Sequence, residues 1–175
     1  MAMQRRPFVV SVADLLRRTG TTRDDVIDAP MEELQVIDTR MPGGSTVHLE
    51  VHLESLNDGA VARGIVEAPW VGGCRRCLKP IAGGLRSEVL EVFEAEPTDG
   101  ETLPLVGDRI DLEPVAREAI LLELPIAPLC EEGCLGLCPT CGVDRNEVAC
   151  SCADAATDAR WVGLEALTFE DEPPA

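Results

Sequence analysis

Six of the eight cysteines in this 175-residue chain fall between Cys130 and Cys152, and this cluster limits what the chain can fold into. Residues 1–7 include two arginines but no apolar stretch follows them, so we expect no secretory signal and a cytoplasmic protein. Thiols stay reduced in that compartment, where clustered cysteines more often bind metal than form disulfides. The cluster therefore predicts a metal site.

Four of these cysteines make the preferred ligand set. Cys138 and Cys141 are separated by two residues, with Gly142 directly after, so that backbone N–H groups can turn toward the sulfurs while both sulfurs reach one ion. Cys150 and Cys152 follow about nine residues later and can complete a tetrahedron. Four thiolates leave no open position, which predicts a structural zinc ion contributing on the order of 10 kcal/mol to folding.

Other assignments stay open, because six cysteines compete for four places. An iron–sulfur cluster uses the same ligands, and buried thiols can also pack simply as small apolar groups. The rival zinc set, which leaves Cys150 and Cys152 free, consists of Cys130, Cys134, Cys138 and Cys141.

A second motif, Cys74-Arg-Arg-Cys77-Leu-Lys79, lies in a predicted loop between strands. Its arginines would favour thiolates and a redox pair. It could also be half of a metal site completed by spare cysteines of the later cluster, or a structural turn that exposes basic residues. The densest basic spot, where we expect any direct RNA contact, consists of Arg75, Arg76 and Lys79; a second possible spot consists of Arg17, Arg18 and Arg23.

The charge balance argues against nucleic-acid binding by the chain as a whole. Fifteen basic and 32 acidic residues give a net charge of −17, whereas nucleic-acid binders usually carry a basic face. Such a field attracts basic proteins. No run of about 18 apolar residues is present, so no membrane helix is expected, and no grouping of carboxylates, nucleophile or phosphate loop indicates an enzyme or a small-molecule substrate.

Periodicity predicts an α+β fold with an antiparallel, β-rich body, a few short helices and a C-terminal cysteine-rich zinc module. Val47, Leu49, Val51 and Leu53 alternate with polar residues, among them His48 and His52, which we expect to be solvated. Asn57-Asp58-Gly59 predicts a hairpin leading into a strand from residue 60 to about 70, and residues 87–93 alternate again.

The remaining segments give weaker signals. We expect a short strand at residues 8–10, a short helix ending near Gly20, a turn-like segment at 21–30, a strand at 34–37, a mobile loop at 94–107 and a helix at 113–124 opened by Pro114. The predicted organisation is a body at 1–129, a zinc module at 130–168 with a closing helix packed on the body, and a disordered acidic tail at 169–175. The closing helix is expected from Trp161, Leu164 and Leu167.

These motifs, taken in order, resemble the YceD family of large ribosomal RNA subunit accumulation proteins over about residues 8–168. The residues that carry the resemblance are Cys74-Arg-Arg-Cys77-Leu, Ile110-Asp-Leu112, Leu124-Pro125, Leu129-Cys130, Cys134-Leu-Gly-Leu-Cys138-Pro-Thr-Cys141-Gly, Cys150-x-Cys152 and Asp158-Ala-Arg160-Trp161-Val-Gly-Leu164. Ala159 stands where proline is common in the family. Some relatives have histidine in place of Cys150 and Cys152, which favours these two as ligands, and others lack the C-terminal cysteines.

The resemblance implies a non-enzymatic cytoplasmic factor that supports the synthesis, processing or stability of large-subunit ribosomal RNA. Expected partners are a basic ribosomal protein or the pre-ribosomal large subunit. The alternative function is a thiol and zinc redox switch that uses Cys74 and Cys77 or spare cysteines of the module. An RNA-processing enzyme is a third possibility, for which the sequence offers no catalytic constellation.

Overall fold

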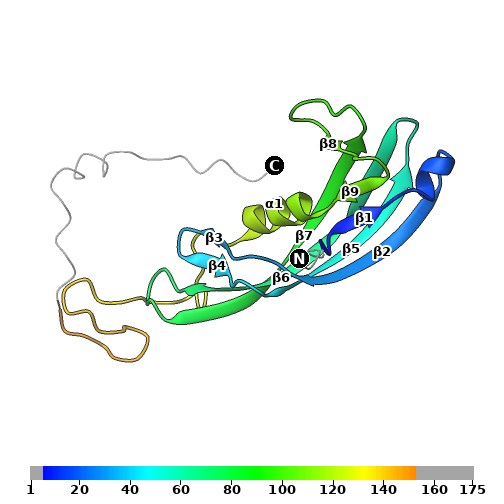
Figure 1. Cartoon of the computed structure of the whole chain (residues 1–175). Helices are drawn as coiled ribbons and strands as arrows, with labels where there is room; N and C mark the ends of the chain where they lie inside the picture. Colours follow the sequence, from blue (N-terminus) through cyan, green and yellow to red (C-terminus); the bar gives the residue numbers. More distant parts are fainter. Residues whose placement is uncertain (1–5, 153–175) are drawn as a thin grey trace, which may run out of the picture.

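A computed structural model describes residues 6–152. Its main feature is a curved antiparallel sheet in which four strands lie side by side (Figure 1). Their order is β2 (Thr22–Pro30), β5 (Thr46–Ser55), β6 (Gly59–Gly73) and β7 (Pro80–Glu94). β6 and β7 are 15 residues each and pair along their full length, so this hairpin extends past the end of β5.

Short elements complete the body. β3 (Leu34–Val36) and β4 (Thr39–Met41) form a small hairpin that joins β6 through Arg40 and Val71. β8 (Leu103–Pro104) pairs with the end of β7, and β1 (Val9–Ser11) pairs with β9 (Arg109–Asp111) in a separate two-stranded sheet. One face of the main sheet is covered by the β1–β9 sheet and by the helix α1 (Glu113–Glu123) (Figure 1).

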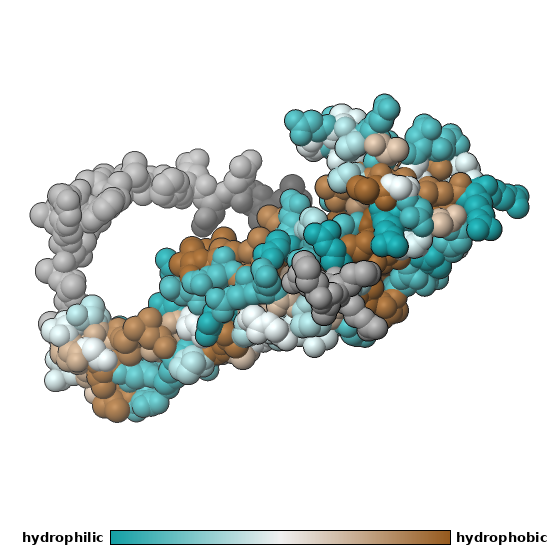
Figure 2. All heavy atoms as spheres, in the orientation of Figure 1, coloured by the Kyte–Doolittle hydropathy of each residue, from teal (hydrophilic) through white to brown (hydrophobic). Residues whose placement is uncertain are grey.

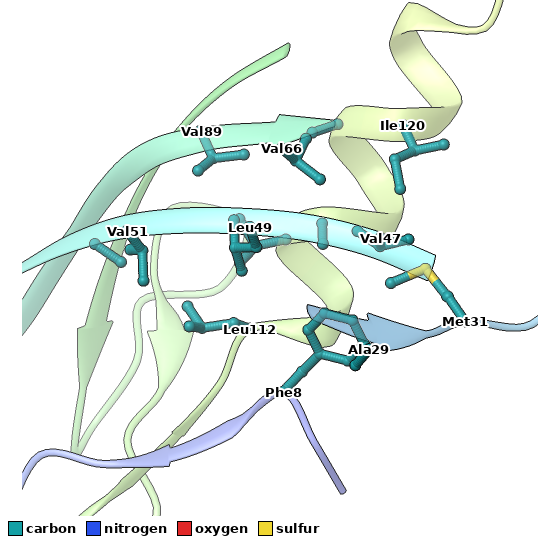
Figure 3. Close-up of a cluster of buried hydrophobic side chains, with 14 of the residues drawn as sticks. Phe8, Ala29, Met31, Val47, Leu49, Val51, Val66, Val89, Leu112 and Ile120 are labelled. Carbon is teal, nitrogen blue, oxygen red and sulfur yellow. The ribbon is translucent and has the colours of Figure 1, made fainter. Parts of the chain in front are cut away.

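The core lies between the main sheet and these covering segments. The predicted alternation in β5 is confirmed: Val47, Leu49, Val51 and Leu53 are all buried, whereas His48 and Glu50 point to the other face. Figure 3 shows side chains of β5, β6 and β7 meeting Phe8, Leu112 and Ile120 from the covering segments. The core is built almost entirely from aliphatic side chains, in agreement with a composition of only three Phe, two Trp and no Tyr.

The helix expected at 113–124 is present as α1, with Pro114 in its second rather than its first position. Proline suits the first turn, where its missing N–H would have no partner within the helix. The Asp111 side chain accepts a hydrogen bond from the Glu113 N–H at 3.0 Å. The buried side of α1 consists of Val115, Ala116, Ala119 and Ile120.

Three expectations for the body were wrong. The helix before Gly20 is a single 3-10 turn, Leu15–Arg17. The segment 21–30 is not a turn but the strand β2, because β5 offers it nine consecutive backbone partners and its polar residues can face solvent. The loop 94–107 includes β8, which pairs with β7 in parallel.

The predicted boundaries at 129 and 169 stay predictions. The closing helix with Trp161, Leu164 and Leu167, and the tail, lie outside the described residues.

His48 and His52 are not isolated solvated residues, since each contacts an aspartate on the neighbouring strand β2. His48 Nδ1 lies 2.7 Å from Asp28 Oδ1, and His52 Nδ1 lies 2.6 Å from Asp24 Oδ1. The hydrogen bond with Asp28, followed by one with Glu50, raises the pKa of His48 above its usual value of 6.5.

Asp28→Asn should therefore return the pKa of His48 toward 6.5, as measured by NMR titration of the ring protons. Because folding raises this pKa, the protonated ring contributes stability that is fully present below pH 6.5 and is lost as the pH rises through the folded-state pKa. The difference in the free energy of unfolding between wild type and Asp28→Asn should therefore shrink as the pH rises. Asp24→Asn, which removes the partner of His52, is the matched control, and an equal shift of His48 in that variant would contradict the assignment.

Candidate metal centres

The eight cysteines gather into two groups of four, and in each group the four sulfur atoms lie within 4.8 Å of one another. The first centre joins Cys74 and Cys77, from the turn between β6 and β7, to Cys130 and Cys134, from the chain after α1. The second centre, all from one segment of the chain, consists of Cys138, Cys141, Cys150 and Cys152. Both centres belong to the end of the molecule where the β6–β7 hairpin turns (Figure 1).

The sulfur spacing of the first centre fits a tetrahedral zinc ion. Four sulfurs at about 2.3 Å from such an ion are about 3.8 Å apart. Cys74 Sγ lies 3.8 Å from Cys134 Sγ, and Cys77 Sγ lies 3.6 Å from Cys130 Sγ. Cys74, Cys77 and Cys134 are buried, so the ligands are held away from water on most sides.

The turn between β6 and β7 shapes the first pair of ligands. The Cys74 N–H donates to the Lys79 carbonyl, the Leu78 N–H donates to the Cys74 carbonyl, and Leu78 adopts a φ of 61°. The backbone N–H of Cys77, with further N–H groups of Cys130 and Arg76, lowers the pKa of the Cys74 thiol to about 6. Cys74 is therefore prepared to bind a cation as a thiolate.

The second centre repeats this arrangement. The Gly142 N–H donates to the Cys138 carbonyl, and Gly142 has a φ of 74°, a conformation that favours glycine. The backbone N–H groups of Cys141 and Thr140 lower the pKa of the Cys138 thiol to about 6. Two Cys-x-x-Cys turns that are distant in sequence thus stabilise their first thiolate in the same way.

Cys130 in the first centre and Cys152 in the second have a raised pKa, in contrast to Cys74 and Cys138. Desolvation of the sulfur, followed by its contacts with neighbouring thiols, raises the pKa of Cys130 to about 12 although the residue as a whole is exposed. Hydrogen bonding with Cys141 raises the pKa of Cys152 to about 12. Four thiolates so close together repel one another, and a divalent cation would offset that repulsion. Each group could therefore hold a metal ion, the first with Cys74, Cys77, Cys130 and Cys134 and the second with Cys138, Cys141, Cys150 and Cys152.

Contacts outside the ligands fasten the cysteine-rich segment to the hairpin turn. The Leu137 N–H donates to the Arg76 carbonyl, and the Arg76 guanidinium donates to the Cys134 carbonyl at 2.9 Å. Lys79 Nζ lies 2.9 Å from Asp144 and 2.7 Å from Glu147. The two centres are thus parts of one connected region.

Gly136 and Asn146 support this region, and sequence reasoning did not single out either. Gly136 has a φ of 71°, and a Cβ there would lie 2.9 Å from the Arg76 carbonyl oxygen. The Asn146 amide donates to Cys134 Sγ at 3.4 Å and accepts from the Leu135 N–H at 2.7 Å. Hydrogen bonds of this kind orient metal ligands. The only indication of their role in the sequence was their position among the cysteines, Gly136 between Cys134 and Cys138 and Asn146 between Cys141 and Cys150.

The structure groups the preferred ligands Cys138, Cys141, Cys150 and Cys152, but it does not group the rival set. Cys130 and Cys134 lie with Cys74 and Cys77 instead. This grouping corresponds to the interpretation in which the Cys74 motif is half of a metal site completed by cysteines of the later cluster. Of the basic spot beside them, Arg76 and Lys79 are engaged in internal contacts, and Arg75 is exposed. Whether these residues contact RNA stays a prediction.

Within residues 6–152, no helix has the length and apolar character needed to cross a membrane. The described molecule is a β-rich body whose long hairpin ends in two potential four-thiolate centres. A comparison with protein families matches residues 62–168 to "Large ribosomal RNA subunit accumulation protein YceD". The chain belongs to the YceD family, as its motifs predicted.

Curated relatives come from mycobacteria. Proteins from Mycobacterium tuberculosis and Mycobacterium bovis, both described as uncharacterized, are 36% identical over 149 residues, which cover 78% of this chain and 70% of each relative. A protein from Mycobacterium leprae, also described as uncharacterized, is 35% identical over 107 residues, covering 57% of this chain and 49% of the relative. No solved structure matches the chain.

Proposed function

We propose that this protein is a non-enzymatic cytoplasmic factor that supports the accumulation, processing or assembly of large-subunit ribosomal RNA through contacts with proteins. Membership of the YceD family carries this proposal, because the name of the family implies a role in the accumulation of that RNA. The partner class is a basic ribosomal protein or the pre-ribosomal large subunit.

Two observations favour protein contacts over direct RNA binding. The net charge of −17 repels phosphates and attracts basic proteins. Arg76 and Lys79, in the densest basic spot of the sequence, direct their charged groups to the protein itself. An RNA partner would have to displace these contacts.

The metal centres are structural in this proposal. Each would hold one zinc ion with four cysteine ligands, which leaves no coordination position for a substrate. The first ion would join the β6–β7 turn to the chain after α1, and the second would order the segment from Cys138 to Cys152.

The function is tested in a strain that lacks the gene. Wild-type protein should restore the ratio of mature large-subunit to small-subunit ribosomal RNA, and cross-linking at native expression levels should recover basic ribosomal proteins. Purified protein incubated with precursor ribosomal RNA and Mg²⁺ should leave the RNA uncleaved. Cleavage that is lost in a point variant, or recovery of RNA without ribosomal proteins, would refute the proposal.

A thiol switch is the second candidate, and one observation favours it. Cys130 Sγ lies 3.6 Å from Cys77 Sγ, so oxidation in the absence of metal could join these two thiols as a disulfide. The switch predicts that peroxide releases metal reversibly and changes ribosomal RNA levels in cells. Unchanged ribosomal RNA in a strain whose protein has lost metal to peroxide would exclude it.

A further inference from the structure

β2 is the edge strand of the main sheet, and its outer side has no paired strand among the described residues. Its register with β5 is continuous from Thr22 to Pro30. Just beyond the ends of the strand, the Ser55 N–H donates to the Thr21 carbonyl and the Met31 N–H donates to the Ser45 carbonyl. Every second residue therefore bonds to β5, and the N–H and C=O groups of Asp24, Val26 and Asp28 point away from the sheet.

The side chains of these three residues lie on the face of the sheet opposite the core. Val26 is 62% exposed. The side chains of Asp24 and Asp28 are 83% and 61% exposed, although each contacts a histidine of β5. The edge thus offers an exposed apolar residue between two carboxylates, together with free backbone groups.

The same face is acidic beyond the edge. Three arginines on this face, Arg40, Arg63 and Arg86, are paired with Glu33, Glu54 and Glu67 respectively. The carboxylates that cross-strand pairing places on this face include Asp24, Asp28, Glu50, Glu54, Glu67 and Glu88. Hydrophilic residues cover much of the surface around β2 in the view of Figure 2. An approaching basic chain would meet complementary charge here.

A second copy of this protein is a poor occupant of the edge. In an antiparallel pair of β2 strands centred on Val26, Asp24 of one copy would lie opposite Asp28 of the other at both ends. Like charges directly opposite one another destabilise a strand pair. Acidic edges of this kind prevent pairing between identical sheets but leave the edge open to a cationic strand.

We propose that the outer edge of β2 binds an extended, basic segment of a protein partner as an additional antiparallel strand. Backbone hydrogen bonds to Asp24, Val26 and Asp28 would provide the pairing, and lysine or arginine side chains facing Asp24 and Asp28 would provide selectivity. The inference deepens the proposed function, since it rests on the protein contacts proposed there and names the surface that makes them.

The neighbouring side chains define the segment further. Toward the Pro30 end, alternate residues of the added strand would lie beside Ile27 and Ala29, which are half-buried and buried, so these residues should be apolar. Pro30 has no N–H, which ends the pairing at that side. The expected ligand alternates basic and apolar residues over no more than the nine residues of β2.

The test uses the full chain and a nine-residue peptide of alternating lysine and valine with blocked ends. In hydrogen exchange followed by NMR, the amides of Arg23, Asp25 and Ile27 should be protected in the free protein. Those of Asp24, Val26 and Asp28 should become protected only after the peptide is added. Binding without this alternating protection would overturn the proposal, and so would an absence of binding.

Two sets of variants separate strand addition from general charge attraction. Val26→Pro removes a backbone donor that the fold does not use, and should weaken peptide binding about tenfold or more, whereas Val26→Thr keeps the donor and should bind normally. Asp24→Asn with Asp28→Asn should also weaken binding about tenfold and reduce its salt dependence. The charge-matched control is Asp99→Asn with Glu101→Gln, in the loop before β8.

Equal binding by Val26→Pro and wild type, with both folded by circular dichroism, would show that charge alone attracts the peptide and would overturn the inference. Tighter binding of a single-stranded RNA than of the peptide would overturn it as well. A failure here leaves the ribosomal RNA measurements of the deletion strain unaffected, so the docking surface and the proposed function can fail separately.

Discussion

Replacing Cys74 with serine should lower the zinc content of the purified protein from two ions per chain to one. Cys74 is fully buried, and the N–H of Cys77 stabilises its thiolate. A serine hydroxyl at this position would stay neutral and would not replace the thiolate as a metal ligand. Binding of a structural zinc ion contributes on the order of 10 kcal/mol in small metal-dependent domains. The first centre also joins parts of the chain that are 60 residues apart, so its loss should release the cysteine-rich segment from the hairpin turn.

Elemental analysis and limited proteolysis measure this effect. Cys74→Ser should expose the chain after residue 128 to protease while the sheet stays intact by hydrogen exchange. Cys150→Ser is the matched control: it should also lose one ion, but the segment up to Cys134 should stay protected, because Cys150 belongs to the second centre. Two zinc ions in Cys74→Ser, or none in the wild type, would refute the assignment of the first centre.

Phe93→Ala should destabilise the body by about 3–5 kcal/mol, the usual cost of truncating a buried phenylalanine. Phe93 is 1% exposed in the core and stands beside Ala60 of β6 and Leu103 of β8, small or partly buried neighbours that cannot fill the space. Urea unfolding followed by circular dichroism gives the difference in the free energy of unfolding.

Leu90→Ala provides the control for this substitution on the same strand. Leu90 is 68% exposed on the opposite face of β7, so its truncation should change stability by no more than about 0.5 kcal/mol. Similar effects of the two variants would mean that the core does not lie on the face of the sheet to which Phe93 belongs.

Much of the body could be predicted from the sequence. A strand that buries only one face of a sheet alternates apolar and polar residues, and this alternation can be recognised without knowing the partner strands. β5, the hairpin at Gly59 and the helix at Pro114 all followed from local pattern. β2 did not, since Asp24, Asp25 and Asp28 have low strand propensity and the strand depends on partners in β5 that local reasoning does not count.

The candidate site was predictable in part for a similar reason. Cys138, Cys141, Cys150 and Cys152 are close in sequence, so spacing alone suggested that they act together. The first centre depends on two distant pairs meeting. That meeting follows from the 15-residue strands of the β6–β7 hairpin, whose length no local signal fixes, and from the exit of the chain from α1 toward the turn.

The wide separation of the first centre's ligands sets an order of events during synthesis. Cys74 and Cys77 leave the ribosome with their hairpin, whereas Cys130 and Cys134 follow 53 to 60 residues later. At about 5–20 residues per second that interval is about 3–12 seconds. A nascent chain therefore carries an incomplete thiol pair for seconds, and the proposed four-thiolate metal site of the first centre could close only after translation has passed α1.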